Sequence, residues 1–234
     1  HCGLVGSEMC MRDSDNLVAD RPAGRAGWYA DARTAYLESL VPPPQPGDVD
    51  MGIITAQIQA RLPADAIITH GAGNFSIWAN KFMQYGRDQR LLGPQSGSMG
   101  FGLPAALAAK AHDSGRFVLC FAGDGDFQMN GAELGTALQA GLHPVILILN
   151  NSSYGTIRMH QERAYPARIS GTEIVNPDYV ALAGAYGFHG ERVTRTDDFA
   201  AAFERAQEAA TGAIVEIVID TEAIAPRTTI SALR

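Results

Sequence analysis

The chain has 234 residues and a mass of 24.9 kDa, and 46% of its residues are hydrophobic. This length suits one large domain or two small ones, and the composition argues against global disorder. Acidic residues outnumber Lys and Arg by 25 to 18, giving a net charge of −7 with no basic run. We therefore expect no nucleic-acid partner, because phosphate contacts need a basic patch.

Two further features of the composition bear on where in the cell the protein is expected. No apolar run approaches the ~20 residues that a membrane span needs, so we expect no membrane partner. The three cysteines, Cys2, Cys10 and Cys120, are too few for a disulfide framework and lack the spacing of a zinc site. We expect unpaired thiols in a reducing cytoplasm.

The first fifty residues differ from the rest of the chain. Residues 1–27 are irregular, and a short helical segment follows over 28–40. The proline-rich stretch 41–47 cannot form a helix or a central strand, and is typical of an extended linker. We therefore expect one unit over 1–47, possibly irregular in its early part, and a domain over 48–234.

From Asp48 onward, helical and strand patterns alternate along the chain. We predict helices over 51–62, 75–83, 103–111, 130–140, 176–186 and 196–210, and strands over 66–69, 117–121, 145–149 and 213–219. Near-continuous apolar strands separated by helices are typical of a parallel sheet buried on both faces. The predicted class is therefore α/β, a parallel sheet with helices on both faces.

Three of the predicted strands end in polar turns, at 71–74, 123–125 and 150–153. The carboxyl ends of parallel strands share one edge of a sheet, and ligands bind outside that edge. The three turns should therefore converge on one binding site.

Two side chains at this edge suggest a cation. Asp124 and Asn151 follow consecutive buried strands, so a strand–helix–strand unit brings them to the same edge. Oxygen ligands of this kind suit Mg²⁺ or Ca²⁺, and sparsely ligated Mg²⁺ usually shares a phosphate. Gly123 and Gly125 would let the backbone approach that phosphate. The alternative, an ordinary Gly-Asp-Gly turn, loses weight because Asn150-Asn151 follows at a strand end.

With these motifs the chain resembles a known family, the thiamine diphosphate (ThDP) enzymes of the acetolactate synthase-like branch. The resemblance covers residues 48–225 and is carried by Gly123-Asp-Gly125 with Asn150-Asn151, by Gly97-Ser-Met-Gly-Phe-Gly-Leu-Pro-Ala-Ala106, Gly123-Asp-Gly-Asp-Phe-Gln-Met-Asn130 and Glu133-Leu-Gly-Thr-Ala137. It implies the ThDP-binding fold and the C-terminal, diphosphate-binding domain of such an enzyme. Residues 1–47 would then be the tail of a preceding, middle domain and a linker.

The resemblance also implies the roles of individual residues. Asp124, the Asn151 side chain and the Ser153 carbonyl would bind Mg²⁺. The Gly97 carbonyl and the Met99 amide would hold the aminopyrimidine ring, and the Met99 side chain would be the apolar wedge that bends the cofactor; in isolation, Met is more often a core gap filler. The full set of implied cofactor contacts is Ala72, Gly73, Asn74, Phe75, Gly97, Ser98, Met99, Gly123, Asp124, Gly125, Asp126, Asn151, Ser153, Tyr154, Gly155 and Thr156.

The resemblance places the catalytic proton-relay glutamate on an N-terminal pyrimidine-binding domain. No catalytic residue is therefore expected in this chain, and Glu133 is expected to be structural. The chain alone should not catalyse the reaction. The complete protein would decarboxylate or ligate a 2-oxo acid of the pyruvate type. The resemblance implies a homo-oligomer, either a dimer or a tetramer.

The sequence departs from the family pattern at two places. Asn74-Phe75 replaces a frequent Gln-His pair, and His160 replaces a tryptophan linked to substrate preference. Arg158, His160, Gln161 and Arg163 form a polar segment that could hold a substrate carboxylate or be a solvated loop. Two other readings remain open: a stand-alone ThDP-binding subunit that needs a separate pyrimidine-domain partner, and a 2-oxo acid decarboxylase of the same superfamily.

Overall fold

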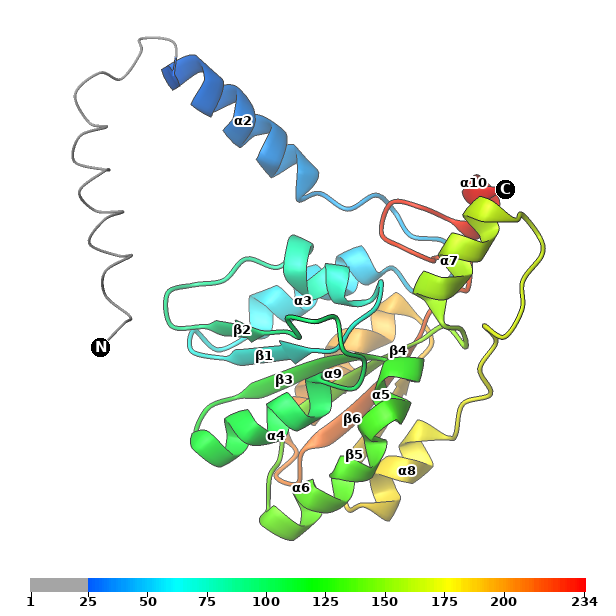
Figure 1. The fold of residues 1–234 in the computed structure, drawn as a ribbon. Helices are drawn as coiled ribbons and strands as arrows, with labels where there is room; N and C mark the ends of the chain where they lie inside the picture. The colour runs from blue at the N-terminus through cyan, green and yellow to red at the C-terminus, as the bar shows by residue number, and fades with distance from the viewer. Residues whose placement is uncertain (1–24) are drawn as a thin grey trace, which may run out of the picture. The chain divides into compact units, whose positions relative to one another are not determined.

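A computed structural model describes residues 25–234, and its chain divides into two compact units, residues 1–41 and 42–234 (Figure 1). The described part of the first unit is helix α2 (Arg25–Ser39), which matches the helix predicted over 28–40. Within α2 the Arg33 guanidinium lies 5.3 Å from the centre of the Tyr36 ring. Cys2, Cys10 and most of the stretch predicted to be irregular lie outside the described residues.

The second unit is built on a six-stranded sheet in the order β2-β1-β3-β4-β6-β5, with every neighbouring pair parallel. The strands are β1 (Ile67–His70), β2 (Arg90–Leu92), β3 (Val118–Gly123), β4 (Val145–Asn150), β5 (His189–Val193) and β6 (Ala213–Val218). The predicted α/β class with a parallel sheet is confirmed.

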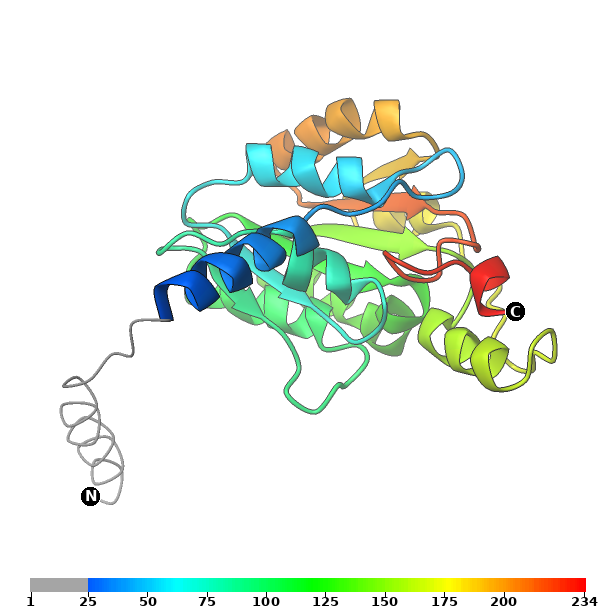
Figure 2. The same cartoon turned by 90° about the horizontal axis from the view of Figure 1, so that it is seen from above.

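Helices cover both faces of this sheet, as Figure 2 shows. One face is covered by α3, η1 and α9, and the other by α4, α5, α6 and α8. The helical elements are α3 (Met51–Arg61), η1 (Trp78–Phe82), α4 (Gly102–His112), α5 (Asp124–Asn130), η2 (Gly131–Glu133), α6 (Leu134–Ala140), α7 (Gly155–Ala164), α8 (Tyr179–Ala185), η3 (Thr196–Asp198), α9 (Phe199–Glu208) and α10 (Ile230–Leu233). Within 25–234, none of the helices has the length and apolar character that crossing a membrane requires.

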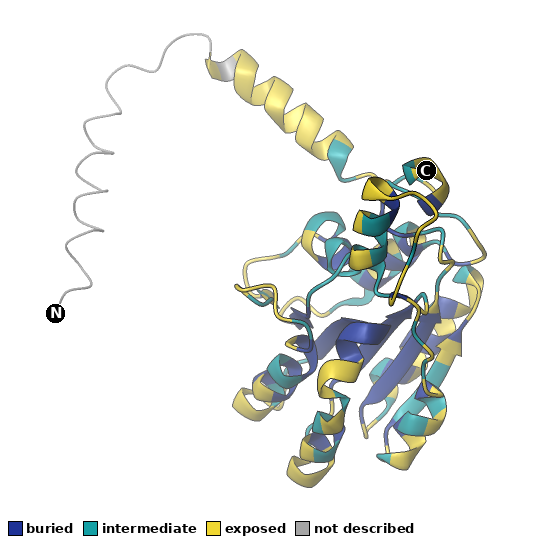
Figure 3. Ribbon diagram, turned by 45° about the vertical axis from the view of Figure 1, so that its right-hand side comes forward, coloured by how far each residue is buried: buried dark blue, intermediate teal, exposed yellow. Residues whose placement is uncertain are grey.

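The core alternates between the two faces along each central strand. On β3, Leu119 and Phe121 pack into one hydrophobic cluster, while Cys120 and Ala122 pack into the other. Successive side chains of a strand point to opposite faces, so a strand buried on both sides must be apolar throughout. Figure 3 shows this buried centre in dark blue. The rigid sheet fixes where each strand ends, and therefore where the segments that follow β1, β3 and β4 begin.

The structure differs from the sequence prediction in several elements. The predicted helix over 75–83 is helical over 76–82, but all of it beyond residue 77 is the π-helix η1 (Trp78–Phe82). No turn separates β3 from the next helix, because α5 begins directly at Asp124. Strands β2 and β5 and helix α7 were not predicted. β2 and β5 are short edge strands without an apolar run, and their extended conformation depends on pairing with β1 and β6.

Candidate functional site

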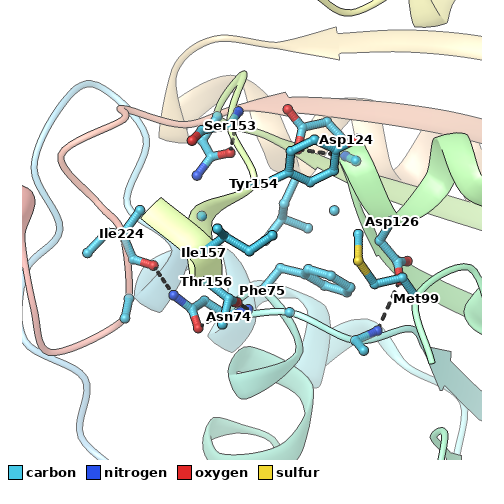
Figure 4. Close-up of a pocket in the computed structure, with 18 of the residues that line it drawn as sticks. Asn74, Phe75, Met99, Asp124, Asp126, Ser153, Tyr154, Thr156, Ile157 and Ile224 are labelled. Atoms are coloured by element: carbon cyan, nitrogen blue, oxygen red, sulfur yellow. Dashed lines mark hydrogen bonds between the residues drawn. The ribbon is translucent and has the colours of Figure 1, made fainter. Parts of the chain in front are cut away.

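A cavity of about 270 Å³ opens at the carboxyl ends of β1, β3 and β4 (Figure 4). Residues from all three segments that were expected to converge, 71–74, 123–125 and 150–153, line it, so the convergence expected from the sequence is present. Its lining residues are Ala72, Gly73, Asn74, Phe75, Trp78, Gly97, Met99, Gly123, Asp124, Gly125, Asp126, Leu149, Asn151, Ser153, Tyr154, Gly155, Thr156, Ile157, Ile219, Ala223, Ile224 and Ala225.

Fifteen of the sixteen cofactor contacts predicted from the sequence line this cavity, and Ser98 is the exception. Ser98 is exposed, and its Oγ lies 2.9 Å from Oγ of Ser96. Glu133, predicted to be structural, is also outside the cavity and accepts a hydrogen bond from the Thr136 hydroxyl at 2.6 Å.

Asp124 is buried at the first position of α5. Its Oδ1 accepts from the Gly125 amide at 2.9 Å, and its Oδ2 accepts from Nδ2 of Asn176 at 2.8 Å. Burial raises the pKa of the Asp124 carboxyl, and these hydrogen bonds oppose the shift. The negative charge of the Asp124 carboxylate is therefore costly to bury without a cation.

The loop after β4 is held in a fixed shape. Oδ1 of Asn151 accepts from the Ser153 amide at 3.1 Å, and Ser152 between them has a left-handed φ of 53°. The Ser153 hydroxyl donates to the Thr172 carbonyl at 3.0 Å. These bonds keep the polar groups of Asn151 and Ser153 at the cavity wall.

Asp126 lies one helical step beyond Gly125 and is 3% exposed. Its Oδ1 accepts from two backbone amides, those of Ala72 at 3.0 Å and Gly100 at 2.9 Å. Burial raises the pKa of this carboxyl as well, and the two amides oppose that effect. The Asp126 carboxylate therefore connects two loops of the protein.

The Asn74-Phe75 pair also contacts protein groups. Nδ2 of Asn74 donates to the Ile224 carbonyl at 2.8 Å, and its Oδ1 accepts from the Thr156 hydroxyl at 3.0 Å. A Cβ added at Gly123 would stand 2.7 Å from the Phe75 ring. Asn74 thus connects the turn after β1 to α7 and to the segment after β6, and only glycine leaves room for the Phe75 ring.

Sequence reasoning missed the apolar side of the cavity. Trp78, Leu149, Ile157 and four residues after β6, namely Ile219, Ala223, Ile224 and Ala225, line it as well. Apolar residues without a motif carry no binding signal in a single sequence, so only the fold reveals them. A helical spacing over 155–164 would have placed Ile157 on the first turn of α7.

The polar segment of α7 does not reach the cavity. None of Arg158, His160, Gln161 and Arg163 is among its lining residues. Nε of Arg158 donates to the buried Glu162 at 2.9 Å, and Gln161 exchanges hydrogen bonds with Ser170. The segment is helical and is not the loop that one reading of the sequence expected.

The charge of the cavity is one-sided. Of the described residues that line it, two are acidic, Asp124 and Asp126, and none is Lys, Arg or His. In the described part of the chain, no three His, Cys, Asp or Glu side chains gather as a metal site. A ligand that carries phosphate groups would meet glycine backbone, amide and hydroxyl groups here, but no basic side chain.

One protein family matches most of the part of the chain that lines the cavity. Residues 71–217 match the family described as "Thiamine pyrophosphate enzyme, C-terminal TPP binding domain". The match includes the segments after β1, β3 and β4 that line the cavity.

Curated relatives and a solved structure agree with the family match. The chain is 36% identical over 162 residues to the acetolactate synthase isozyme 2 large subunit of Escherichia coli K12, covering 68% of this chain and 30% of the relative. It is 33% identical over 171 residues to the acetolactate synthase large subunit of Corynebacterium glutamicum, covering 70% and 27%. The thiamine diphosphate-dependent 4-hydroxybenzoylformate decarboxylase of Rhodococcus jostii RHA1 superposes with a TM-score of 0.68 at 29% identity, covering 76% of this chain and 34% of that one. The aligned part of this chain thus spans less than a third of these two curated relatives.

Proposed function

Because the chain belongs to the thiamine pyrophosphate enzymes, through their C-terminal TPP binding domain, we propose that it is the cofactor-binding part of an acetolactate synthase-like enzyme. Thiamine pyrophosphate and ThDP are the same compound. The complete enzyme would use ThDP and Mg²⁺ to decarboxylate or ligate a 2-oxo acid of the pyruvate type. The observation that carries this proposal is the cavity itself, which is lined by fifteen of the sixteen residues that the resemblance implies as cofactor contacts.

The donor chemistry of the cavity fits Mg²⁺. Asp124, the Asn151 side chain and the Ser153 carbonyl would supply one carboxylate oxygen and two neutral oxygens, the hard ligands that Mg²⁺ prefers. A diphosphate would carry further negative charge into a cavity whose charged lining residues are both acidic. A divalent cation offsets that repulsion, so Mg²⁺ and diphosphate should bind together.

The glycine backbone fits a close approach by the diphosphate. A Cβ added at Gly125 would stand 2.6 Å from the Tyr154 ring, so the wall of the cavity has no space for a side chain there. The amides around Gly73, Gly125 and Gly155 would face the phosphate oxygens. Gly97 and Met99 also line the cavity and would hold the aminopyrimidine ring.

When bound, ThDP would supply a nucleophilic carbon for reaction with the keto group of a 2-oxo acid. The residues of this chain bind and orient the reacting groups. Ile157, Ile219 and Ile224 give the cavity an apolar side. The proton-relay glutamate is expected from a pyrimidine-binding domain outside these residues.

Several statements about the whole protein belong to the same proposal. Residues 1–47 would be the tail of a preceding domain with a linker, and 48–234 the ThDP-binding domain. The protein would be a cytoplasmic homo-oligomer, a dimer or tetramer, with a small 2-oxo acid as substrate and no nucleic-acid or membrane partner. The alternative of a stand-alone subunit would require a separate pyrimidine-domain partner.

A second candidate activity is simple decarboxylation. It is favoured by the likeness to a decarboxylase of known structure and by His160 at the position of the substrate-linked tryptophan of many acetolactate synthases. The two candidates share the cofactor and the first chemical step. They differ in whether a second oxo compound is ligated.

The test is an assay of the complete protein with pyruvate and other 2-oxo acids. We expect carbon dioxide release that requires ThDP and is lost on chelation of Mg²⁺. Acetolactate as product supports ligation, and acetaldehyde supports decarboxylation. An Asp113→Asn variant, changed at an exposed site beyond α4, should keep the activity. Failure to release carbon dioxide from any 2-oxo acid would overturn the proposed activity.

A further inference from the structure

Helix α5 holds one residue of the glycine-rich loop from both sides. The Gly100 amide donates to Oδ1 of Asp126 at 2.9 Å, and the Gly100 carbonyl accepts from Nδ2 of Asn130 at 3.0 Å. Asp126 and Asn130 are four residues apart, so they lie on the same face of the helix. Both polar groups of Gly100 are thus fixed to α5.

The same carboxylate oxygen reaches a second loop. Oδ1 of Asp126 also accepts from the Ala72 amide at 3.0 Å, in the turn after β1 (Figure 4). A Cβ added at Gly71 would overlap the Asp126 carboxylate, so the loop is seated directly against it. One buried oxygen therefore joins the turn at Ala72 to the loop that ends at Gly100.

Gly100 itself leaves little freedom for this contact. Its φ of +81° favours glycine, and a Cβ there would stand 2.8 Å from both Met129 and Asn130. The loop can therefore lie against α5 in this conformation only while position 100 is glycine. Met99, the neighbouring residue, lines the cavity.

A direct role for Asp126 in binding phosphate is disfavoured by its charge. A carboxylate repels a diphosphate, and Oδ1 of Asp126 is already an acceptor for two backbone amides. Its position between the two loops explains a buried acid at this place better than a contact to an anion does.

We propose that Asp126 and Asn130 are positioning residues that set the spacing between the two ends of the cofactor site. They act through Ala72, on the side assigned to the diphosphate, and through Gly100, next to the residues assigned to the aminopyrimidine. This inference rests on the proposed function. A ligand held at both ends gains affinity only when the two subsites match its length. A less fixed spacing should therefore lower the affinity for the whole cofactor more than the affinity for a ligand that fills one subsite.

The test compares two variants of Asp126, one that lacks the charge and one that lacks the hydrogen-bond acceptor. Asp126→Asn keeps the shape and the Oδ1 acceptor but removes the charge, whereas Asp126→Ala removes the acceptor. We expect Asp126→Ala to weaken ThDP binding, in the presence of Mg²⁺, by about 10- to 100-fold, because part of the affinity gained by engaging both subsites at once would be lost. We expect Asp126→Asn to restore wild-type affinity.

A second probe separates positioning from a general loss of structure. Inorganic pyrophosphate with Mg²⁺ occupies only the diphosphate end, so its affinity should fall much less than that of ThDP in Asp126→Ala. Calorimetry on the complete protein measures both affinities, and near-ultraviolet circular dichroism reports the bound aminopyrimidine. Equal losses for ThDP and pyrophosphate would overturn the inference, and so would an Asp126→Asn variant as defective as Asp126→Ala.

The outcomes also separate this inference from the proposed function. If wild-type protein binds no ThDP, the proposed function fails. If wild-type protein binds ThDP and Asp126→Ala binds it equally well, only the positioning role fails. Should Asp126→Ala not fold, Asn130→Asp replaces it, since this variant removes the donor to the Gly100 carbonyl at nearly constant shape. It should then show the selective loss of ThDP affinity, and wild-type ThDP affinity in it would overturn the inference.

Discussion

Nδ2 of Asn176 lies 2.8 Å from Oδ2 of Asp124 and 2.8 Å from Oδ1 of Asn150, so one amide group connects the ends of β3 and β4. The oxygen of the same amide accepts from the Tyr179 hydroxyl at 3.0 Å and from Nε2 of Gln128 at 2.7 Å. Asn176 is thus fixed on both sides. It holds the carboxylate of Asp124 in one orientation.

Loss of this amide should weaken the proposed metal site. We expect Asn176→Ala to lower the apparent affinity for Mg²⁺, measured in the presence of ThDP, by about 10-fold, because partners of a ligand orient it. Tyr179→Phe removes the hydroxyl that lies 3.0 Å from Oδ1 of Asn176 and 3.3 Å from the Asp124 carbonyl oxygen, but it leaves the bond from Asn176 to the Asp124 carboxylate. Its effect should therefore be smaller. Unchanged Mg²⁺ affinity in Asn176→Ala would show that Asp124 needs no such support.

Gly125 allows a second prediction about the cavity wall. In Gly125→Ala the new Cβ would stand 2.6 Å from the Tyr154 ring, so the ring or the start of α5 must move. We expect weaker ThDP binding, and partial recovery when Tyr154→Ala is added. The matched control is Gly135→Ala in α6, where the nearest neighbour would be 3.9 Å away. That variant should bind ThDP normally, and equal losses in both variants would contradict the prediction.

A buried carboxylate on α7 should make stability depend on pH. Glu162 is fully buried and accepts from Arg158, Arg234 and the Ala167 amide at 2.8 to 3.1 Å. The hydrogen bonds from Arg234, followed by that from Ala167, lower the pKa of Glu162 from 4.5 to about 2. A carboxyl with a lowered folded-state pKa stabilises the fold above its ordinary pKa, and this contribution is lost as the pH falls from 4.5 toward 2.

Glu162→Gln should therefore flatten this pH dependence. The free energy of unfolding, measured with urea at a series of pH values, should fall less steeply with acid in the variant than in the wild type. The difference between the two proteins isolates Glu162 from the other acids. Parallel curves below pH 4.5 would show that its ion pairs do not contribute.

A second buried acid joins the core of the sheet to its edge. Glu216 on β6 is 3% exposed and accepts from Nδ2 of Asn150 and from Nε of Arg192, each at 2.6 Å. Arg192→Met would leave this charge without its cation and should cost about 2 kcal/mol in unfolding free energy, discounted because Arg192 is partly exposed. The exposed Arg195, 3.9 Å from Asp197, is the control. Arg195→Met should cost under about 0.5 kcal/mol, and similar losses at both positions would contradict the prediction.

Much of the fold follows from local pattern, and the exceptions have physical reasons. The strands at 118–123 and 145–150 are predictable because a strand buried on both faces must be apolar throughout. The segment 123–125 was expected to be a turn, whereas α5 begins at Asp124. The helix forms because Gly123 is extended and Asp124 and Asp126 occupy the first turn, where acids are favoured by the helix dipole.

The candidate site also has one part that the sequence predicts and one part that it does not. Its polar half, such as Asp124 and Asn151, is marked by residue type and by position at strand ends. Its apolar half is not, because Ile157 and Ile224 become neighbours of the cavity only through the packing of α7 and of the segment after β6. The contacts of Asp126 and Asn74 to distant backbone also depend on tertiary structure. A motif assigns such residues to a site without showing what they contact.

The central claim is that this cavity binds ThDP through Mg²⁺ held by Asp124, Asn151 and Ser153. Its most direct test is a calorimetric titration of the complete protein with ThDP, with Mg²⁺ present and after its removal by chelation. We predict binding only with Mg²⁺ in the wild type, and none in Asp124→Ala under either condition. Wild-type affinity in Asp124→Ala, or equal binding with and without Mg²⁺, would contradict the account.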